Sequence, residues 1–321
     1  MDELSKPDKT TNSVNSTNST KSTKLPKPPR VVASYTTLPS RYSVLLRSIQ
    51  TLKKQTHKLD AIYLTLPLRA KRLNKEYPPL PDELAALCTV VRSDVDYGPL
   101  TKVYGALMTE TNPDTIIISC DDDVFFEPHH VETLIKHHRT HPKSAICGTG
   151  ALIGKGLPFI SIVSTVRPFD GWSGFTGFDV DQRGRRVDLI FGVASVLYTR
   201  GMFPVTEALY DELFKFSLQD DSIFHNDDVL ISGYLSKQGI ERRVFFDIPT
   251  IHHDSGEDAL SGDVFKMIGR LNTAIEKVKA LGFFPVMEDV NLDETPTGRV
   301  IFVFIILIAL IILCLCLYRV V

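Results

Sequence analysis

"DTIIISCDDDVFF" (residues 114–126) places three consecutive aspartates directly after an apolar, β-branched run. Residues 115–120 have the composition that is typical of a strand buried in a core. Neighbouring carboxylates repel each other and are costly to remove from water, so the position of this acidic cluster needs a physical reason. A ligand that neutralises the charges at the end of a core strand would supply one.

The overall composition is that of a globular protein with a polar tail. The 321 residues are 43% hydrophobic and 23% charged with a net charge of -2, which gives no general attraction to nucleic acid. Residues 1–29 are mainly Ser, Thr, Asn, Lys and Pro. We expect them to form a disordered tail and not a secretory signal, because they contain no apolar core.

Residues 300–318 ("VIFVFIILIALIILCLCLY") contain no charge, no Pro and no Gly. As a helix this segment would be roughly 28 Å long, which is close to the thickness of the hydrocarbon core of a bilayer. A buried core helix is the alternative, but a helix that is apolar on every face is typical of a membrane span. We therefore expect a single-pass C-terminal anchor, joined to the body by a juxtamembrane linker (293–299).

The orientation in the membrane is weakly determined by the sequence. Arg299 and Arg319 flank the segment on both sides, so the positive charges show no asymmetry. Without a signal peptide, the large domain is expected on the cytosolic side. The soluble part contains an odd number of scattered cysteines, Cys88, Cys120 and Cys147. This pattern favours reduced thiols over a disulfide framework, which agrees with a cytosolic domain.

Between residues 30 and 292, β-branched apolar segments alternate with segments of helical periodicity. Strands are expected at 30–37, 60–67, 88–93 and 115–120, and helices at 40–55, 81–87, 100–109 and 128–139. Ser40 is the expected N-cap of the first helix. This alternation predicts one α/β domain over residues 30–292, with a central, mostly parallel sheet flanked by helices.

In such sheets, ligands bind beyond the carboxyl ends of the strands. Continued strand alternation would turn Asp121 and Asp123 to one side and Asp122 to the other. Two carboxylates on one side suit Mg²⁺ or Mn²⁺, particularly an ion shared with substrate phosphates. The alternative is an exposed acidic turn that caps the helix beginning at Pro128.

Four stretches in order carry a likeness to a known family. They are "ASYTTLPSRYSVLLRSIQTLKKQ" (33–55), "DVDYGPLTKVYGAL" (94–107), "SCDDDVFFEP" (119–128) and "HNDDVLISGYLSKQGI" (225–240). Together they resemble the nucleotide-sugar glycosyltransferases of the GT-A fold, which is Rossmann-like, and are close to family 2. The likeness covers residues 30 to about 255 and excludes the tail and the anchor. The ordered set is more specific than any one motif, because Asp-x-Asp occurs by chance in many proteins.

The resemblance implies a nucleotide-diphosphate sugar as donor, with a UDP-sugar expected, and a divalent ion, Mn²⁺ or Mg²⁺. Asp121 and Asp123 would hold the metal, and Asp121 or Asp122 would contact the ribose or the sugar. The first stretch would hold the nucleotide through Thr36 and Arg41.

The second stretch would contact the donor through Tyr97, Thr101 and Lys102. Its "YGPLTK" turn opens a helix, where backbone N–H groups bind anions and a lysine adds positive charge. The alternative for Lys102 is a solvated lysine in a first helical turn.

The fourth stretch begins a helix with Asn226 or Asp227 as a plausible N-cap. Two adjacent aspartates exceed what capping requires. In inverting enzymes of the resembled family, a carboxylate at this place accepts the proton of the acceptor hydroxyl. Asp228 is the expected base and Asp227 the second choice, while capping alone is the alternative. The apolar residues that follow are expected to face the core (Val229, Leu230 and Leu235).

Further candidates lie late in the domain. His252 and His253 lie in a predicted loop. The resemblance implies that one of the two is a metal ligand. Trp172 lies in a Gly- and aromatic-rich loop that suits a sugar ring, or it fills the core. Gly192 and Ser195, in a predicted strand and turn, resemble the small residues that line the acceptor site, although close strand packing would use them too.

The sequence thus predicts a metal-dependent, inverting glycosyltransferase that acts on a hydroxyl of a glycan or glycoconjugate. The resemblance does not exclude retention of configuration at the sugar. Competing hypotheses are a nucleotidyltransferase or phosphohydrolase with clustered aspartates, and a non-catalytic, membrane-tethered module that binds sugar nucleotides or glycans. The sequence contains no Gly-rich phosphate loop near the first strand, which speaks against the nucleotidyltransferase or phosphohydrolase alternative.

Overall fold

The structure, a computed structural model, describes residues 28–153, 160–164, 184–249, 251–253, 258 and 264–285. The expected tail up to residue 27, the linker 293–299 and the apolar segment 300–318 lie outside these residues. Within the described ranges, no helix is both long enough and apolar enough to cross a membrane.

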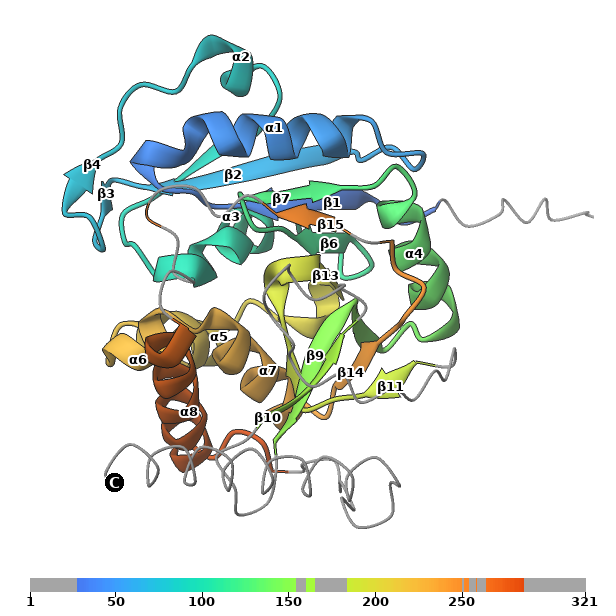
Figure 1. Cartoon of the computed structure of the whole chain (residues 1–321), viewed down its shortest axis with the longest axis vertical. Coiled ribbons are helices and arrows are strands. Elements are labelled where there is room, and N and C mark those ends of the chain that lie inside the picture. The colour runs from blue at the N-terminus through green and yellow to red at the C-terminus, as the bar shows by residue number, and fades with distance from the viewer. Residues whose placement is uncertain are drawn as a thin grey trace, which may run out of the picture.

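An eight-stranded sheet forms the centre of the domain, with the strand order β11-β14-β8-β13-β6-β1-β2-β5 (Figure 1). Its strands are β1 (Val31–Tyr35), β2 (Ala61–Pro67), β5 (Thr89–Ser93), β6 (Ile116–Ser119), β8 (Ser144–Cys147), β11 (Arg185–Arg186), β13 (Val196–Thr199) and β14 (Glu241–Val244). Four of the seven pairings are parallel, and β13 runs antiparallel between β6 and β8. The predicted α/β class with a mostly parallel sheet is confirmed.

Helices cover both faces of the sheet. They are α1 (Tyr42–Lys53), α2 (Asp82–Ala85), α3 (Thr101–Thr109), α4 (His130–Thr140), α5 (Glu207–Leu209), the π-helix η5 (Tyr210–Lys215), α6 (Asp221–Phe224), α7 (Asp227–Lys237) and α8 (Val264–Ala280). Short 3-10 turns occur at η1 (Pro39–Arg41), η2 (Gly98–Leu100), η3 (Gly192–Ala194) and η4 (Arg200–Met202). The four helices predicted in the first half of the domain are present with small shifts at their ends.

The predicted N-cap of the first helix is wrong. Ser40 lies within η1, and its hydroxyl donates to Asp258 Oδ2 at 2.7 Å. No side chain caps α1, which continues directly from this 3-10 turn. The 3-10 turn places Arg41, and not Ser40, at the N-cap position of α1.

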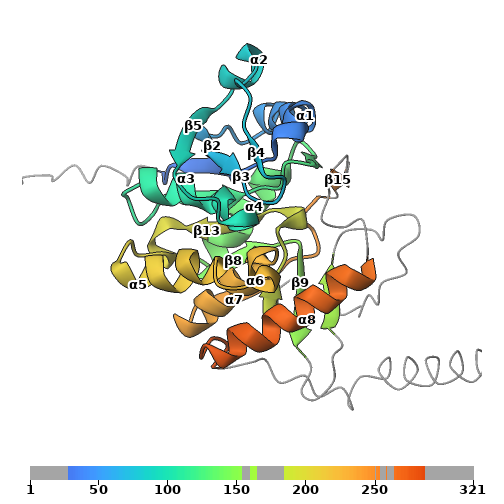
Figure 2. The same cartoon turned by 90° about the vertical axis from the view of Figure 1, so that its left-hand side faces the viewer.

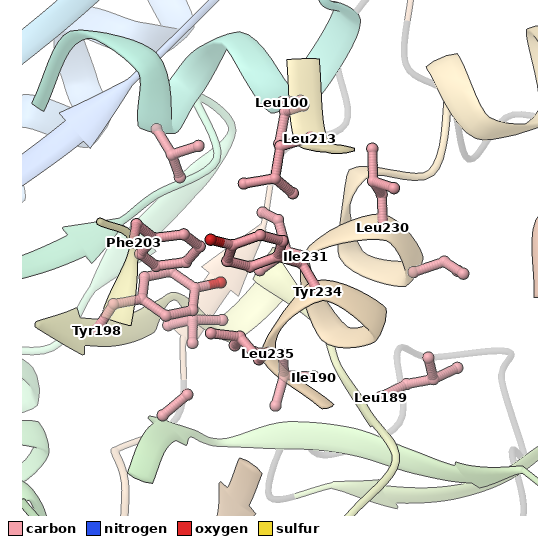
Figure 3. Packing of buried hydrophobic residues seen from close by; sticks show 14 of the residues in the cluster. Leu100, Leu189, Ile190, Tyr198, Phe203, Leu213, Leu230, Ile231, Tyr234 and Leu235 are labelled. Carbon is pink, nitrogen blue, oxygen red and sulfur yellow. The ribbon is translucent and has the colours of Figure 1, made fainter. Parts of the chain in front are cut away.

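The sheet separates two hydrophobic clusters, as the alternation of side chains along β1 shows. Ala33 and Tyr35 face the cluster that contains Leu45, Ile49 and Leu52 of α1 and the buried side of α4. Val32 faces the opposite cluster, to which α3 and α7 contribute. In this cluster, Phe203 and Tyr234 stack at 5.8 Å between ring centroids (Figure 3). The expected core residues of α7, Val229, Leu230 and Leu235, are all fully buried.

Three smaller sheets and one helix complete the domain. β9 (Thr149–Ile153) pairs with both β10 (Ile160–Ser164) and β12 (Leu189–Ile190), and β3 (Arg69–Ala70) forms a hairpin with β4 (Lys75–Glu76). β7 (Val124–Phe126) directly follows the aspartates and pairs with β15 (Ile251–His253). The helix α8 packs on α6 and α7 (Figure 2).

Gly105 sets the distance between α3 and the sheet. Its N–H donates to Thr65 Oγ1 at 3.0 Å, and a Cβ here would lie 2.4 Å from that oxygen and 3.2 Å from Val91. Gly105→Ala should therefore lower the free energy of unfolding by about 1–3 kcal/mol, because the added methyl group overpacks the interface. Denaturant unfolding measures this change.

Gly269, within α8, is the matched control because, among the described residues, no atom outside its chain neighbours and its own helix backbone lies within 4 Å of the position of its Cβ. Gly269→Ala should stabilise the protein by up to about 1 kcal/mol through helix propensity alone. If both substitutions stabilise the protein equally, α3 does not pack on the sheet as described.

Candidate functional site

Lys102 lies at the beginning of α3 and forms two ion pairs. Its Nζ lies 2.7 Å from Asp121 Oδ1 and 2.9 Å from Asp227 Oδ2, and the lysine side chain is only 4% exposed. The alternative of a solvated lysine is wrong. The ion pairs bring together three of the stretches that the sequence singled out, those around residues 94–107, 119–128 and 225–240.

The adjacent carboxylates at the start of α7 serve different partners. Asp227 is buried and pairs with Lys102, whereas Asp228 Oδ1 accepts a hydrogen bond from the Gly192 N–H at 3.0 Å. No side chain caps α7, so the capping alternative is wrong. Burial and the charge of Asp227 raise the pKa of Asp228 well above its ordinary value, despite the opposing attraction of Lys102.

Gly192 lies at the point where these charges meet. A Cβ here would be 2.7 Å from Lys102 Nζ, 3.3 Å from Asp228 Oδ1 and 3.4 Å from Asp121 Oδ1. The predicted strand at this position is wrong, because β12 ends at Ile190 and Gly192 begins the turn η3. A side chain here would require the flexible end of Lys102 to move from its present place.

Arg41 holds the remainder of the acidic cluster. Its Nη2 and Nε donate to the two oxygens of Asp122 at 2.7 and 2.9 Å, and Nη2 also lies 2.8 Å from Asp123 Oδ2. The hydroxyl of Thr37 donates to Asp122 Oδ2 at 2.5 Å. The guanidinium thus binds Asp122 in a bidentate manner, which fixes its orientation.

The predicted alternation of the three aspartates is wrong, because Asp122 and Asp123 share Arg41 while Asp121 pairs with Lys102. The strand β6 ends at Ser119, so the aspartates lie in a turn to which strand alternation does not apply. Asp121 is still close enough to Asp123 for that charge to raise its pKa, in addition to the larger effect of burial.

The acidic residues fit a divalent ion in one particular way. Asp121 and Asp123 keep 33% and 14% of their side chains accessible. Over the described ranges, no group of three or more His, Cys, Asp or Glu has an arrangement that could hold a metal ion. An ion at this place could therefore take at most two carboxylates from these residues, and it would need its other oxygens from elsewhere, as Mg²⁺ often takes them from a phosphate.

His252 and His253 lie on strand β15, so the prediction of a loop is wrong. In the antiparallel pairing with β7, His253 is opposite Val124 and His252 is opposite Phe125. The backbone of both histidines thus runs beside the residues that directly follow Asp123. Their role as metal ligands stays a prediction.

Three of the expected donor-binding residues are occupied by contacts within the protein. The Thr36 hydroxyl donates to the Thr65 carbonyl at 2.9 Å, and Thr101 Oγ1 accepts from the Tyr97 N–H at 3.0 Å. The ring of Tyr97 is buried against Tyr104 and Phe214. Donor binding by these side chains stays a prediction.

Of the expected acceptor residues, Trp172 lies outside the described residues. Ser195 is fully buried, and its Oγ lies 2.8 Å from Nε2 of His130, so its hydroxyl faces α4.

Sequence reasoning missed three side chains at or near the site. They are Thr37, His130 and Arg72. Burial and the charge of Arg41 lower the pKa of Arg72. Thr37 lies inside the first quoted stretch, which was a usable signal. No local pattern marks His130 or Arg72.

The chain matches no protein-family model and no curated protein. The likeness to GT-A glycosyltransferases therefore depends on the four quoted stretches of the sequence alone.

The raised pKa of Asp228 predicts how stability changes with pH. A carboxyl whose pKa is higher in the folded state than the unfolded value of about 3.9 stabilises the fold fully below that value, and this contribution is lost as the pH rises through the folded-state pKa. Asp228→Asn does not titrate, so it should raise the Tm at neutral pH and flatten the decline of Tm as the pH rises above the unfolded-state value. Thermal unfolding across this range measures both effects.

Asp227→Asn is the comparison, because it removes the partner of a buried lysine. It should lower the Tm at neutral pH. An unchanged decline with pH in Asp228→Asn would show that this carboxyl ionises normally.

Proposed function

We propose that this protein is a metal-dependent glycosyltransferase that moves a sugar from a nucleotide-diphosphate donor, with a UDP-sugar expected, to a hydroxyl of a glycan or glycoconjugate. The observation that carries the proposal is the meeting of Lys102, Asp121 and Asp228 at Gly192. These residues come from three separate stretches of the sequence, yet they form one site with a cation, an accessible carboxylate and a carboxyl of raised pKa. We further propose that residues 300–318 hold the catalytic domain at the cytosolic face of a membrane.

The donor diphosphate would bind between Lys102 and the accessible carboxylates. Asp121 and Asp123 would hold a divalent ion, which when bound neutralises the diphosphate and stabilises the negative charge of the departing nucleotide. Lys102, at the first turn of α3, would turn from the carboxylates toward the phosphate, which is also a strong acceptor for an ammonium group.

Asp122 would contact the ribose or the sugar of the donor. The bidentate bond from Arg41 and the hydroxyl of Thr37 fix this carboxylate, so it would need little reorganisation when the donor arrives.

Asp228 would be the general base. The acceptor oxygen forms a bond to the anomeric carbon, its proton passes to Asp228, and the nucleotide diphosphate leaves with the bonding electrons. A raised pKa brings the carboxylate closer to the pH at which a base works best, and the Gly192 N–H holds its Oδ1 in one orientation. Attack from the side opposite the leaving group inverts the configuration of the sugar.

A donor screen tests the proposal. The full-length protein in detergent, supplied with Mn²⁺ and a panel of nucleotide sugars, should hydrolyse or transfer one of them. If it hydrolyses nucleotides without regard to the sugar, the phosphohydrolase alternative is favoured. If UDP and Mn²⁺ raise the Tm but no sugar reacts, the non-catalytic module is favoured.

Asp123→Ala tests the metal site. It should abolish transfer with little loss of stability, because Arg41 keeps both of its bonds to Asp122. EDTA should silence the wild-type protein and Mn²⁺ should restore it. Asp114→Ala, which removes an exposed carboxylate outside the site, is the control and should keep full activity. Transfer by the wild type at an unchanged rate in EDTA would contradict metal dependence.

Asp228→Asn tests the base. The amide keeps the size of the side chain but cannot accept a proton, so kcat for transfer should fall by about 10²–10⁴-fold. The KM for the donor should change little, because its proposed contacts are Lys102, Asp121 and Asp123. Asp227→Asn should cause the smaller loss of kcat; a larger loss would exchange the roles of the two residues. Transfer at wild-type rates by both variants would exclude the proposed base.

A further inference from the structure

Ser195 has an unusual backbone conformation at the end of the turn η3. Its φ is 57° and its ψ is 156°, in a region that non-glycine residues seldom occupy. Such strain persists only where surrounding contacts enforce it, and it is concentrated at functional sites. The contacts that enforce it are therefore informative.

The side chain of Ser195 is held by His130, the first residue of α4. A hydrogen bond of 2.8 Å joins Oγ of the serine to Nε2 of the histidine, and both residues are fully buried. The imidazole lies against Phe126 of β7, with ring centroids 4.8 Å apart. His130 therefore connects the turn η3 to the segment that directly follows the acidic cluster.

The other end of the same turn is Gly192. The Ser195 N–H donates to the Gly192 carbonyl at 2.7 Å, and the Gly192 N–H in turn donates to Asp228 Oδ1. The Cα of Gly192 also borders Lys102 Nζ, since a Cβ would lie only 2.7 Å away. A chain of short contacts thus leads from His130 through the strained serine to the proposed base and to the buried lysine.

We infer that His130 is a positioning residue of the active site. By holding the hydroxyl of Ser195, it keeps the turn η3 in the conformation that directs the Gly192 N–H at Asp228 and leaves space for Lys102. This inference depends on the proposed function for its kinetic consequence. Its structural part, the control of the Gly192 amide by His130, does not depend on that function.

Kinetics of four variants test the inference on the full-length protein. Ser195→Ala and His130→Leu each remove the hydrogen bond, so each should lower kcat by roughly 10- to 100-fold with little change in the KM for the donor. The double variant should lose no more than the more impaired single variant, because both changes remove the same interaction. His130→Gln, whose amide group can reach the Ser195 hydroxyl, should recover much of the rate.

Ser217→Ala is the matched control. This serine is also buried, and its hydroxyl donates to the Phe214 carbonyl at 2.8 Å, away from the charged residues of the site. It should change stability without changing kcat. If Ser195→Ala and His130→Leu likewise lower only the Tm, the hydrogen bond is structural and the inference is overturned.

Hydrogen exchange at the Gly192 amide tests the same inference without any enzyme activity. In Ser195→Ala and His130→Leu the exchange should accelerate by about tenfold or more, since the local turn opens more readily, while Ser217→Ala should leave it unchanged. Faster exchange in a protein that transfers no sugar would support the positioning role and reject the proposed function. Unchanged exchange in both variants would overturn the inference, whatever the protein catalyses.

Discussion

The buried ammonium group of Lys102 is the interaction on which the site depends. It lies between Asp121, which follows the central strand β6, and Asp227, which begins α7. Removing one member of a buried ion pair costs about 3–5 kcal/mol, because the remaining charge is left without compensation. Each of these elements is therefore fixed by the charges of the others, and the two halves of the domain are joined at the site.

A second cation divides the acidic cluster. Arg41 binds Asp122 and Asp123 while Lys102 binds Asp121, so the three neighbouring aspartates are held from two different elements, the turn η1 and the helix α3. Arg41 and Lys102 face five carboxylates once Asp227 and Asp228 are included. Burial is the main cause of the raised pKa values of Asp121 and Asp228, and the neighbouring carboxylates raise them further. The excess of negative charge would favour the entry of a divalent cation.

Features that depend on local sequence could be predicted, and features that depend on distant contacts could not. The β-branched run before Asp121 predicted a central strand, and the apolar spacing of α1 predicted a helix. The serine at position 40 does not cap that helix, because it lies inside a 3-10 turn, and its hydroxyl instead binds Asp258, far along the chain.

The residues of the site follow the same division. The sequence identified Lys102, Asp121, Asp227 and Asp228, because motifs mark them. It could not show that Asp122 and Asp123 share one arginine, since that depends on where β6 ends, or that His130 meets Ser195.

The absence of a side chain at Gly192 also has a consequence for the comparison of related chains. In a related chain, alanine or a larger residue at this position would require the flexible end of the lysine side chain to move, so this one residue is a marker of where the lysine lies.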